Sequence, residues 1–190
     1  MSEPAQVLEP APWPPFEVVG SSEIARLGNL GLRLDTVRWP EGIESRHRAI
    51  ETPDAVWVVP FFESGRTVLV RQWRHPWDCS AWEVPAGTLE AGEDSLPGAQ
   101  RELAEEAGLT AHSWISLGRT RGSALLTGVQ HLYLARNLTR VERRPEAAEA
   151  DMIVRELPLS AAVAAALDGT IEHATSIAAL IRAARHLGLL

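Results

Sequence analysis

The alternation of apolar and polar residues predicts a β-rich first half of the chain. Residues 30–39 alternate leucines with small or polar residues, and this period of two is typical of a strand. A Pro-Glu-Gly turn follows, and residues 45–51 are predicted to form another strand. The nearly continuous apolar run at 55–62 indicates a buried strand, which we expect to form a hairpin with residues 67–73.

The second half of the chain combines helical periods with further strands. A helix is expected to begin near Ser95 and to end at Gly108, because glycine suits the left-handed position after a helix. Two more helices are predicted at residues 160–167 and 175–186, and short strands at 82–85, 112–117, 130–134 and 151–156. This order of elements indicates an α+β sandwich rather than a repeating βαβ fold.

Composition and charge limit the classes of protein to which the chain can belong. Its 190 residues, 45% of them hydrophobic, suit one domain with an added element. The net charge of −7 and the pI of about 5.4 argue against broad binding to nucleic acids or membrane surfaces. No apolar run is long enough for a transmembrane helix, and the N-terminus does not resemble a signal peptide. The single cysteine, Cys79, fits a reducing compartment, so we expect a cytoplasmic protein.

One helical stretch gathers acidic side chains. At about 100° per residue, Glu102, Glu105 and Glu106 lie on one helix face, so their carboxylates converge. Carboxylates this close repel one another unless a cation lies among them. Oxygen ligands on a rigid helix favour Mg²⁺ or Mn²⁺, and these cations favour phosphate substrates. The apolar face that we expect to be buried consists of Leu96, Ala99, Leu103 and Ala107.

The spacing around these glutamates follows a specific pattern. A glycine is followed by five residues and Glu, and then by seven residues and Arg-Glu-apolar-x-Glu-Glu-x-Gly-apolar. The residues in this order are Gly87, Glu93, Arg101, Glu102, Leu103, Glu105, Glu106, Gly108 and Leu109. The stretch resembles the signature of the Nudix hydrolases without a departure. The resemblance implies an α/β/α sandwich with a mixed sheet, and hydrolysis of a diphosphate linked to another moiety.

The resemblance also implies roles for the residues of the signature. The Mg²⁺ ligands would be the backbone carbonyl of Ala86 and the side chains of Glu102, Glu105 and Glu106. Arg101 is expected to reach both Glu93 and Glu105, and such an ion-pair network would orient the ligands. The alternative is a solvated acidic helix with ordinary surface ion pairs, which does not account for the complete spacing.

Residues ahead of the helix narrow the resemblance. A Gln-x-Arg motif at 72–74 precedes Glu-x-Pro-Ala-Gly at 83–87. This order resembles the Nudix branch that cleaves ADP-ribose and nucleoside diphosphate sugars into a nucleoside monophosphate and a sugar phosphate. The branch implies a homodimer whose N-terminal strands are exchanged or packed between subunits. We therefore predict an N-terminal arm and β extension at residues 1–45, and the hydrolase domain at residues 46–190.

Three residues outside the signature are candidates for substrate binding. Arg74 is expected to contact a phosphate, because its planar guanidinium matches phosphate oxygens; a surface ion pair is the alternative. Glu83 would contact substrate or support the metal shell, unless it faces solvent from an edge strand. Arg46 would reach the substrate of a neighbouring subunit; the alternative is a solvated strand face.

Aromatic and histidine residues leave further alternatives open. Trp39, Trp73 or Trp77 would stack on a base, although packing in the core or at an interface explains each of them as well. The histidines show no zinc-ligand spacing, so His112, His131 and His173 are interpreted as structural residues.

The loop at residues 119–128 departs from the branch that the chain resembles. Many members carry an acid there, which serves as general base or additional metal ligand and would fall near Gly128. This loop contains neither Asp nor Glu. The base would therefore be Glu105, Glu83 or a hydroxide generated by the metals alone.

Two other functions stay open at this point. One is a house-cleaning pyrophosphatase for nucleoside triphosphates or dinucleoside polyphosphates. Arg119 and Arg121 in the acid-free loop would bind a terminal phosphate, or they are simply solvated loop residues. The other is a non-catalytic Nudix sensor that binds a nucleotide. The Gln-x-Arg and Glu-x-Pro-Ala-Gly motifs favour the nucleotide-sugar hydrolase, and the complete set of carboxylates argues against the sensor.

Overall fold

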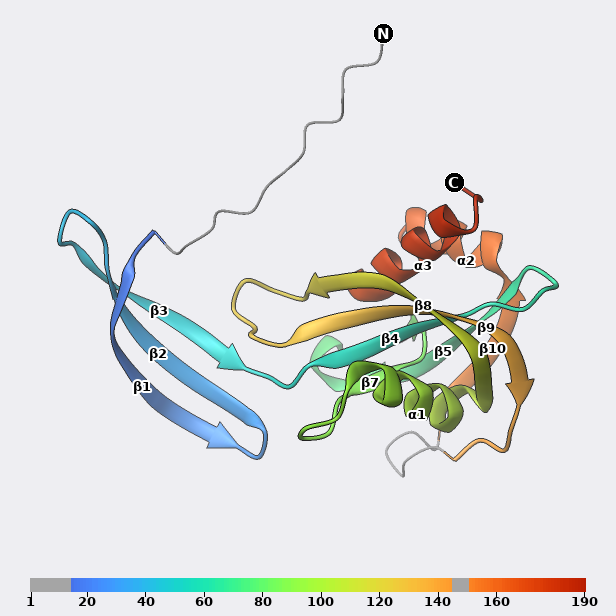
Figure 1. Ribbon diagram of the computed structural model, residues 1–190, viewed down its shortest axis with the longest axis horizontal. Coiled ribbons are helices and arrows are strands. Elements are labelled where there is room, and N and C mark those ends of the chain that lie inside the picture. Colours follow the sequence, from blue (N-terminus) through green and yellow to red (C-terminus); the bar gives the residue numbers. More distant parts are fainter. Residues whose placement is uncertain (1–14, 145–150) are drawn as a thin grey trace, which may run out of the picture. The chain divides into compact units, whose positions relative to one another are not determined.

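The computed structural model describes residues 15–144 and 151–190, and the chain divides into two compact units, Met1–Glu51 and Thr52–Leu190 (Figure 1). The N-terminal unit contains an antiparallel sheet of β1 (Glu17–Leu27), β2 (Leu30–Arg38) and β3 (Glu44–Glu51), in that order. The boundary predicted between residues 45 and 46 falls inside β3. The division comes after Glu51 instead, because β3 pairs with β2 along its whole length.

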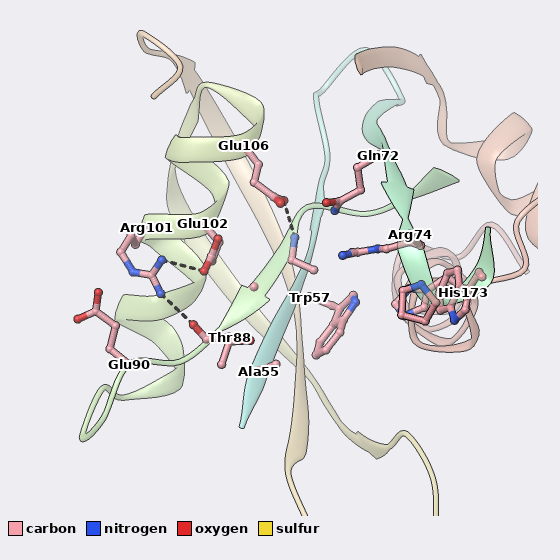
Figure 2. Close-up of a pocket in the computed structure, with 14 residues that line it drawn as sticks. Ala55, Trp57, Gln72, Arg74, Thr88, Glu90, Arg101, Glu102, Glu106 and His173 are labelled. Atoms are coloured by element: carbon pink, nitrogen blue, oxygen red, sulfur yellow. Dashed lines mark hydrogen bonds and ion pairs between the residues drawn. The ribbon is translucent and has the colours of Figure 1, made fainter. Parts of the chain in front are cut away.

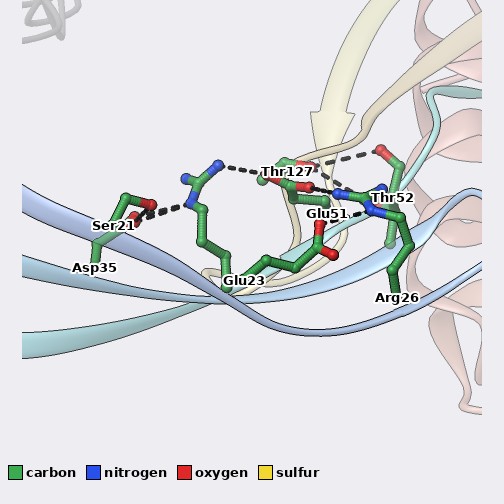
Figure 3. A network of polar contacts seen from close by, with 8 residues as sticks. Ser21, Glu23, Arg26, Asp35, Glu51, Thr52 and Thr127 are labelled. Carbon is green, nitrogen blue, oxygen red and sulfur yellow. Dashed lines mark hydrogen bonds and ion pairs between the residues drawn. The ribbon is translucent and has the colours of Figure 1, made fainter.

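Besides the backbone pairing of its strands, the N-terminal unit is linked by side-chain ion pairs rather than by an apolar core. Arg26 and Arg33 both bond the carboxylate of Glu51, at 2.7 and 2.6 Å, and Arg33 also bonds Asp35 at 3.0 Å. Figure 3 shows this row of contacts along the sheet. Val37 is 1% exposed, whereas many large apolar side chains of this sheet are open to solvent. A sheet of this kind buries little apolar surface by itself.

The C-terminal unit is built around two sheets. A four-stranded sheet has the order β7 (Ala86–Thr88), β4 (Ala55–Pro60), β9 (Val129–Arg140) and β8 (Leu109–Arg121). A three-stranded sheet has the order β10 (Ile153–Pro158), β5 (Arg66–Arg74) and β6 (Cys79–Glu83). The β4–β9 pair is parallel and the other pairs are antiparallel, so the fold is mixed.

Helices cover both faces of this layered β structure. On one side, α1 (Ser95–Ala107) packs Ala99 and Leu103 against Val56 and Val58 of β4. On the other side, α2 (Leu159–Leu167) and α3 (Ala174–His186) close a second core with residues such as Val59. Figure 1 shows the sheets between α1 and the α2–α3 pair. The predicted α+β, α/β/α sandwich with a mixed sheet and an N-terminal β extension is thus confirmed.

The predicted hairpin between residues 55–62 and 67–73 is wrong. The turn itself is present, since the amide of Gly65 donates to the carbonyl of Phe62 at 2.9 Å. Beyond the isolated Phe61–Thr67 bridge, however, β4 and β5 diverge into different sheets. The physical reason is that β7 and β9 already occupy both edges of β4, so β5 has no free edge to pair with.

Other element boundaries agree with expectation or shift by a few residues. The two C-terminal helices are confirmed, and the strand predicted at residues 151–156 is β10. The strand predicted at residues 82–85 is instead two, because β6 ends at Glu83 and β7 begins at Ala86. In the described ranges, no helix is long and apolar enough to cross a membrane. Most of the N-terminal arm lies outside those ranges.

Candidate active site

Helix α1 ends where the sequence predicts, but its N-cap is Asp94 rather than the expected Ser95. It begins at Ser95 with Asp94 as N-cap, and Gly108 follows it in the left-handed conformation at φ 62°. The Ser95 hydroxyl lies 2.7 Å from the Tyr133 hydroxyl of β9, which ties the first turn to the sheet. The buried face is smaller than expected: Ala99 and Leu103 are buried, Ala107 is partly buried, and Leu96 in the first turn is 37% exposed.

Arg101 organises the acidic face of α1. Its Nε and Nη2 donate to the two oxygens of Glu93 at 3.1 and 3.0 Å. Its Nη1 donates to Glu102 at 2.7 Å and to Glu105 at 3.1 Å, while Nη2 also reaches the Thr88 carbonyl at 3.2 Å. The hydrogen bonds that Arg101 donates to Glu93 lower the pKa of Glu93 and raise the pKa of Arg101, so both groups stay charged. The ion-pair network expected from the sequence is present.

The backbone of β7 lies directly against two of the glutamates. Glu106 is 1% exposed and accepts a hydrogen bond from the Ala86 amide at 2.7 Å. Glu102 is 6% exposed, and a Cβ added at Gly87 would lie 2.0 Å from its Oε1. A side chain at position 87 would therefore displace the Glu102 carboxylate.

The donor set partly fits a divalent cation. Ala86, Glu102 and Glu106 line one cavity and offer only oxygen atoms, which hard cations prefer. Glu105 does not line it, and its carboxylate is held by Arg101. Over the residues described, no three His, Cys, Asp or Glu side chains are gathered as a metal site, since Arg101 lies between the carboxylates. The ligand roles of these residues stay predictions.

A cavity of about 590 Å³ extends from these carboxylates across the C-terminal unit. Figure 2 shows Arg101 and Glu102 on one side, Arg74 and His173 on the other, and Trp57 between them. We call Ala86, Gly87, Glu102 and Glu106 the carboxylate end. We call Trp57, His173 and Trp77 the aromatic end, where Trp77 comes from the short 3₁₀ helix η1 (His75–Trp77).

Arg74 and Glu83 form one unit at the wall of the cavity. Arg74 lines the cavity, and its Nε and Nη2 donate to the two oxygens of Glu83, both at 2.7 Å. Glu83 is 1% exposed, so the alternative of a carboxylate that faces solvent from edge strand β6 is wrong. Arg74 covers it, and a bidentate pair fixes the plane of the guanidinium. The contacts of both residues with substrate stay predictions.

Trp57 and His173 are among the cavity residues that the sequence did not identify. Trp57 lies within an apolar run, where the sequence suggested burial alone, but it alternates with Val56 and Val58 and so faces the opposite side of β4 from them. His173, interpreted as structural, lines the cavity at the start of α3. Burial lowers the pKa of His173, and Arg74 adds to this effect, whereas Glu83 opposes it. No local pattern distinguishes His173 from the other histidines.

Other candidates lie outside the cavity. Arg46 is exposed on β3 of the N-terminal unit. In the same unit, Trp39 donates from Nε1 to Ser45 at 3.0 Å, which supports packing rather than base stacking. Trp73 is 51% exposed and does not line the cavity, so Trp77 is the member of the three that does.

The acid-free loop cannot hold a side chain at the expected position. Arg119 and Arg121 belong to β8, so the connection to β9 begins at Gly122. A Cβ added at Gly128 would lie 2.3 Å from the backbone oxygen of Pro53, and the Gly128 amide donates to Thr52 Oγ1 at 3.0 Å. A glutamate at position 128 would therefore require the backbone to move.

This chain belongs to the Nudix family: the model of the NUDIX domain matches residues 51–180. It is 34% identical over 170 residues to an ADP-ribose pyrophosphatase of Mycobacterium tuberculosis, covering 87% of this chain and 82% of that protein. An ADP-ribose pyrophosphatase of Bacillus subtilis is 32% identical over 136 residues, covering 70% and 74%.

A solved structure shows the same fold. The crystal structure of an ADP compounds hydrolase superposes with a TM-score of 0.80 at 17% identity, and the match covers 95% of this chain and all of that one. The family predicted from the glutamate spacing is thus confirmed, together with its assignment to the pyrophosphohydrolases.

Proposed function

We propose that this chain hydrolyses the diphosphate bond of ADP-ribose or a related nucleoside diphosphate sugar, giving a nucleoside monophosphate and a sugar phosphate. The observation that carries the proposal is the cavity that unites the carboxylate end with Arg74. Its volume of about 590 Å³ lies within the usual range for small-molecule sites. The names of the relatives from M. tuberculosis and B. subtilis support this substrate.

The proposed cofactor is Mg²⁺, with Mn²⁺ as a substitute. Glu102, Glu106 and the Ala86 carbonyl would hold it, and Glu105 would join them after leaving Arg101. When bound, such a cation polarises a phosphoryl oxygen and lowers the pKa of a coordinated water. Arg74, with its plane set by Glu83, would orient the diphosphate.

The hydrogen bonds and the exposure of each candidate indicate which group can act as general base. Both oxygens of Glu83 accept hydrogen bonds from Arg74, and its carboxylate is buried behind that residue. This arrangement suits an orienting role rather than proton abstraction from water. The remaining candidates are Glu105, which is partly exposed beside Arg101, and the water activated by the cation itself.

A substrate panel tests the proposal. ADP-ribose, ADP-glucose, ATP and diadenosine tetraphosphate are each incubated with Mg²⁺ or Mn²⁺, and phosphate is measured after coupling to a phosphatase. We expect the highest kcat/KM on ADP-ribose or ADP-glucose. Preference for ATP or diadenosine tetraphosphate would favour the house-cleaning alternative, and nucleotide binding without hydrolysis of any substrate would favour the sensor.

We also propose that the chain forms a homodimer through its N-terminal sheet. Leu27 and Leu30 are 81% and 44% exposed, and with Ala25, Leu32 and Ile50 they line an apolar groove of about 280 Å³. Such a surface is typical of an interface. Exposed Arg46 would be available to a partner subunit. The cytoplasmic location stays a prediction.

Two leucine substitutions test the dimer in the full chain. Leu27→Asp combined with Leu30→Asp should halve the mass measured by light scattering, because two charges on an apolar interface oppose association. Leu167→Asp on α2, at a residue that is 64% exposed, is the matched control and should leave the mass unchanged. An unchanged mass in the double variant would contradict the proposal.

A further inference from the structure

One edge of the His173 ring is anchored by buried groups. Nδ1 lies 2.9 Å from Ser176 Oγ and 3.4 Å from Glu83 Oε2. Ser176 is fully buried, and its hydroxyl oxygen accepts a hydrogen bond from the Val84 amide at 3.1 Å. The imidazole is therefore connected both to α3 and to the segment between β6 and β7. This anchoring keeps the ring in one orientation at the wall of the cavity.

The other nitrogen of His173 has a different environment. Among the described residues, Nε2 makes no hydrogen bond or ion pair, although the ring lines the cavity. The buried negative charge of Glu83 favours a proton on Nδ1, so Nε2 of the neutral ring carries a lone pair. The lowered pKa of His173 agrees with a neutral ring. The aromatic end thus presents a hydrogen-bond acceptor.

The two neighbouring indoles complete the surface around this acceptor. The ring centroid of His173 lies 5.9 Å from that of Trp57 and 5.8 Å from that of Trp77, with interplanar angles of 34° and 39°. His173 is thus in contact with both indoles, and the three rings form one aromatic surface at this end of the cavity. Indole faces carry negative charge density and attract weakly positive C–H groups.

A sugar matches this combination of groups. One side of a sugar ring presents C–H groups, and its hydroxyls donate hydrogen bonds. We propose that the aromatic end is a sugar subsite, in which Trp57 and Trp77 contact the carbon face of the sugar and His173 Nε2 accepts a hydrogen bond from one of its hydroxyls. The inference rests on the proposed function, because it assigns the sugar of that substrate to this end of the same cavity.

Two substrates that differ in the sugar test the inference. The kcat/KM is measured on ADP-ribose and on a simple alkyl ester of ADP, which has the diphosphate but no sugar beyond it. His173→Phe keeps a flat ring and removes the acceptor, so it should lower kcat/KM on ADP-ribose about tenfold, as loss of one hydrogen bond does. On the alkyl ester the change should stay within about twofold.

Two further variants separate recognition from structure. His173→Gln restores an acceptor oxygen and should recover part of the activity on ADP-ribose. His131→Phe is the matched control, because His131 also pairs with an acid, Asp54 at 3.2 Å, but does not line the cavity. It should affect both substrates equally. An equal loss on both substrates in His173→Phe would overturn the sugar subsite.

A binding measurement distinguishes failure of this inference from failure of the proposed function. Calorimetric titration without divalent cations compares ADP-ribose with ADP, which lacks the second sugar. His173→Phe should lower the affinity for ADP-ribose about tenfold and leave the affinity for ADP unchanged. If the wild-type chain cleaves neither ADP-ribose nor the alkyl ester, the proposed function fails. The titration then still tests whether the aromatic end binds the sugar. Equal affinities of wild type and variant for ADP-ribose, or no binding by wild type, would refute it.

Discussion

The two ends of the cavity are built in opposite ways. At the carboxylate end, Glu102 and Glu106 lie one turn apart on α1, and Arg101 pairs with Glu102 and with Glu105. At the aromatic end, Trp57 and His173 come from β4 and the start of α3, far apart in the sequence. The first arrangement follows from helical periodicity, whereas the second depends on how strands and helices pack.

The two ends also differ in how they treat charge. At the carboxylate end, charged groups face the cavity and are balanced by Arg101. Beside the aromatic end, Arg74 reaches the cavity while Glu83 stays behind it, 1% exposed. One end is thus suited to a cation and phosphates, and the other to recognition of an uncharged group. The following substitutions separate these contributions, in order of decreasing effect.

Substitution at the carboxylate end should affect catalysis most. Glu106→Gln is expected to lower kcat/KM by at least about 100-fold, equivalent to about 2.7 kcal/mol, because it removes a ligand charge without changing the shape of the side chain. Glu90→Gln is the matched control, since Glu90 also lines the cavity but is exposed at its rim. Its rate should stay within about threefold. A near-wild-type rate in Glu106→Gln would exclude the ligand role.

Substitution behind the aromatic end should affect stability. Glu83→Gln is expected to lower the free energy of unfolding by about 2 kcal/mol, because the bidentate pair with Arg74 is lost in a buried position. In Glu156→Gln, the carboxylate that pairs with Arg66 and Arg140 is 29% exposed, so the loss should be about 1 kcal/mol or less. Urea unfolding measures both. Equal losses would show that burial of Glu83 adds nothing.

A substitution at Gly87, which lies against Glu102, should have a smaller effect on activity. Gly87→Ala is expected to lower kcat/KM about tenfold, because its Cβ would displace the Glu102 carboxylate, which lies 2.0 Å from that position. Gly20→Ala is the control, since a Cβ there would meet Thr36 Cβ at an ordinary 3.8 Å. Unchanged kinetics in Gly87→Ala would show that Glu102 can move without cost.

The pKa of His173 predicts a modest dependence of stability on pH. Burial lowers this pKa in the folded chain, so below about pH 6.5, the ordinary value, the unfolded chain binds more protons. The free energy of unfolding should then fall as pH decreases from 6.5 to the pKa of His173 in the folded chain. His173→Gln should remove the part of this decrease that comes from His173. Urea unfolding at pH 7.5 and pH 5.5 checks it. Identical pH dependence in variant and wild type would contradict the lowered pKa.

Local sequence patterns predicted much of the fold and one end of the site. The period of two identified strands, and the end of α1 at Gly108 agrees with the left-handed residue expected there. The contact between Arg101 and Glu93 was also predictable, because both lie in one short segment. The prediction of a hairpin at residues 55–73 was wrong, because two adjacent strands can pair with each other or with strands distant in sequence.

The pairing of Arg74 with Glu83 shows what sequence alone leaves open. Both residues were candidates from their motifs, but their mutual bond depends on the antiparallel pairing of β5 with β6. In the same way, Gly128 could be recognised as the place of a missing acid. The sequence does not show, however, that the backbone of Pro53 occupies the space of a side chain at that position, because this contact arises only from packing.

Local sequence was enough to identify the family and the carboxylate end, because the spacing of Glu102, Arg101 and Glu93 acts within one helix and the loop before it. The aromatic end depends on packing between distant segments. Trp57 and His173 meet because β4 and α3 pack together, and no local period encodes that contact. Short-range geometry is set by backbone dihedral angles, whereas contacts between distant segments depend on how the whole core closes.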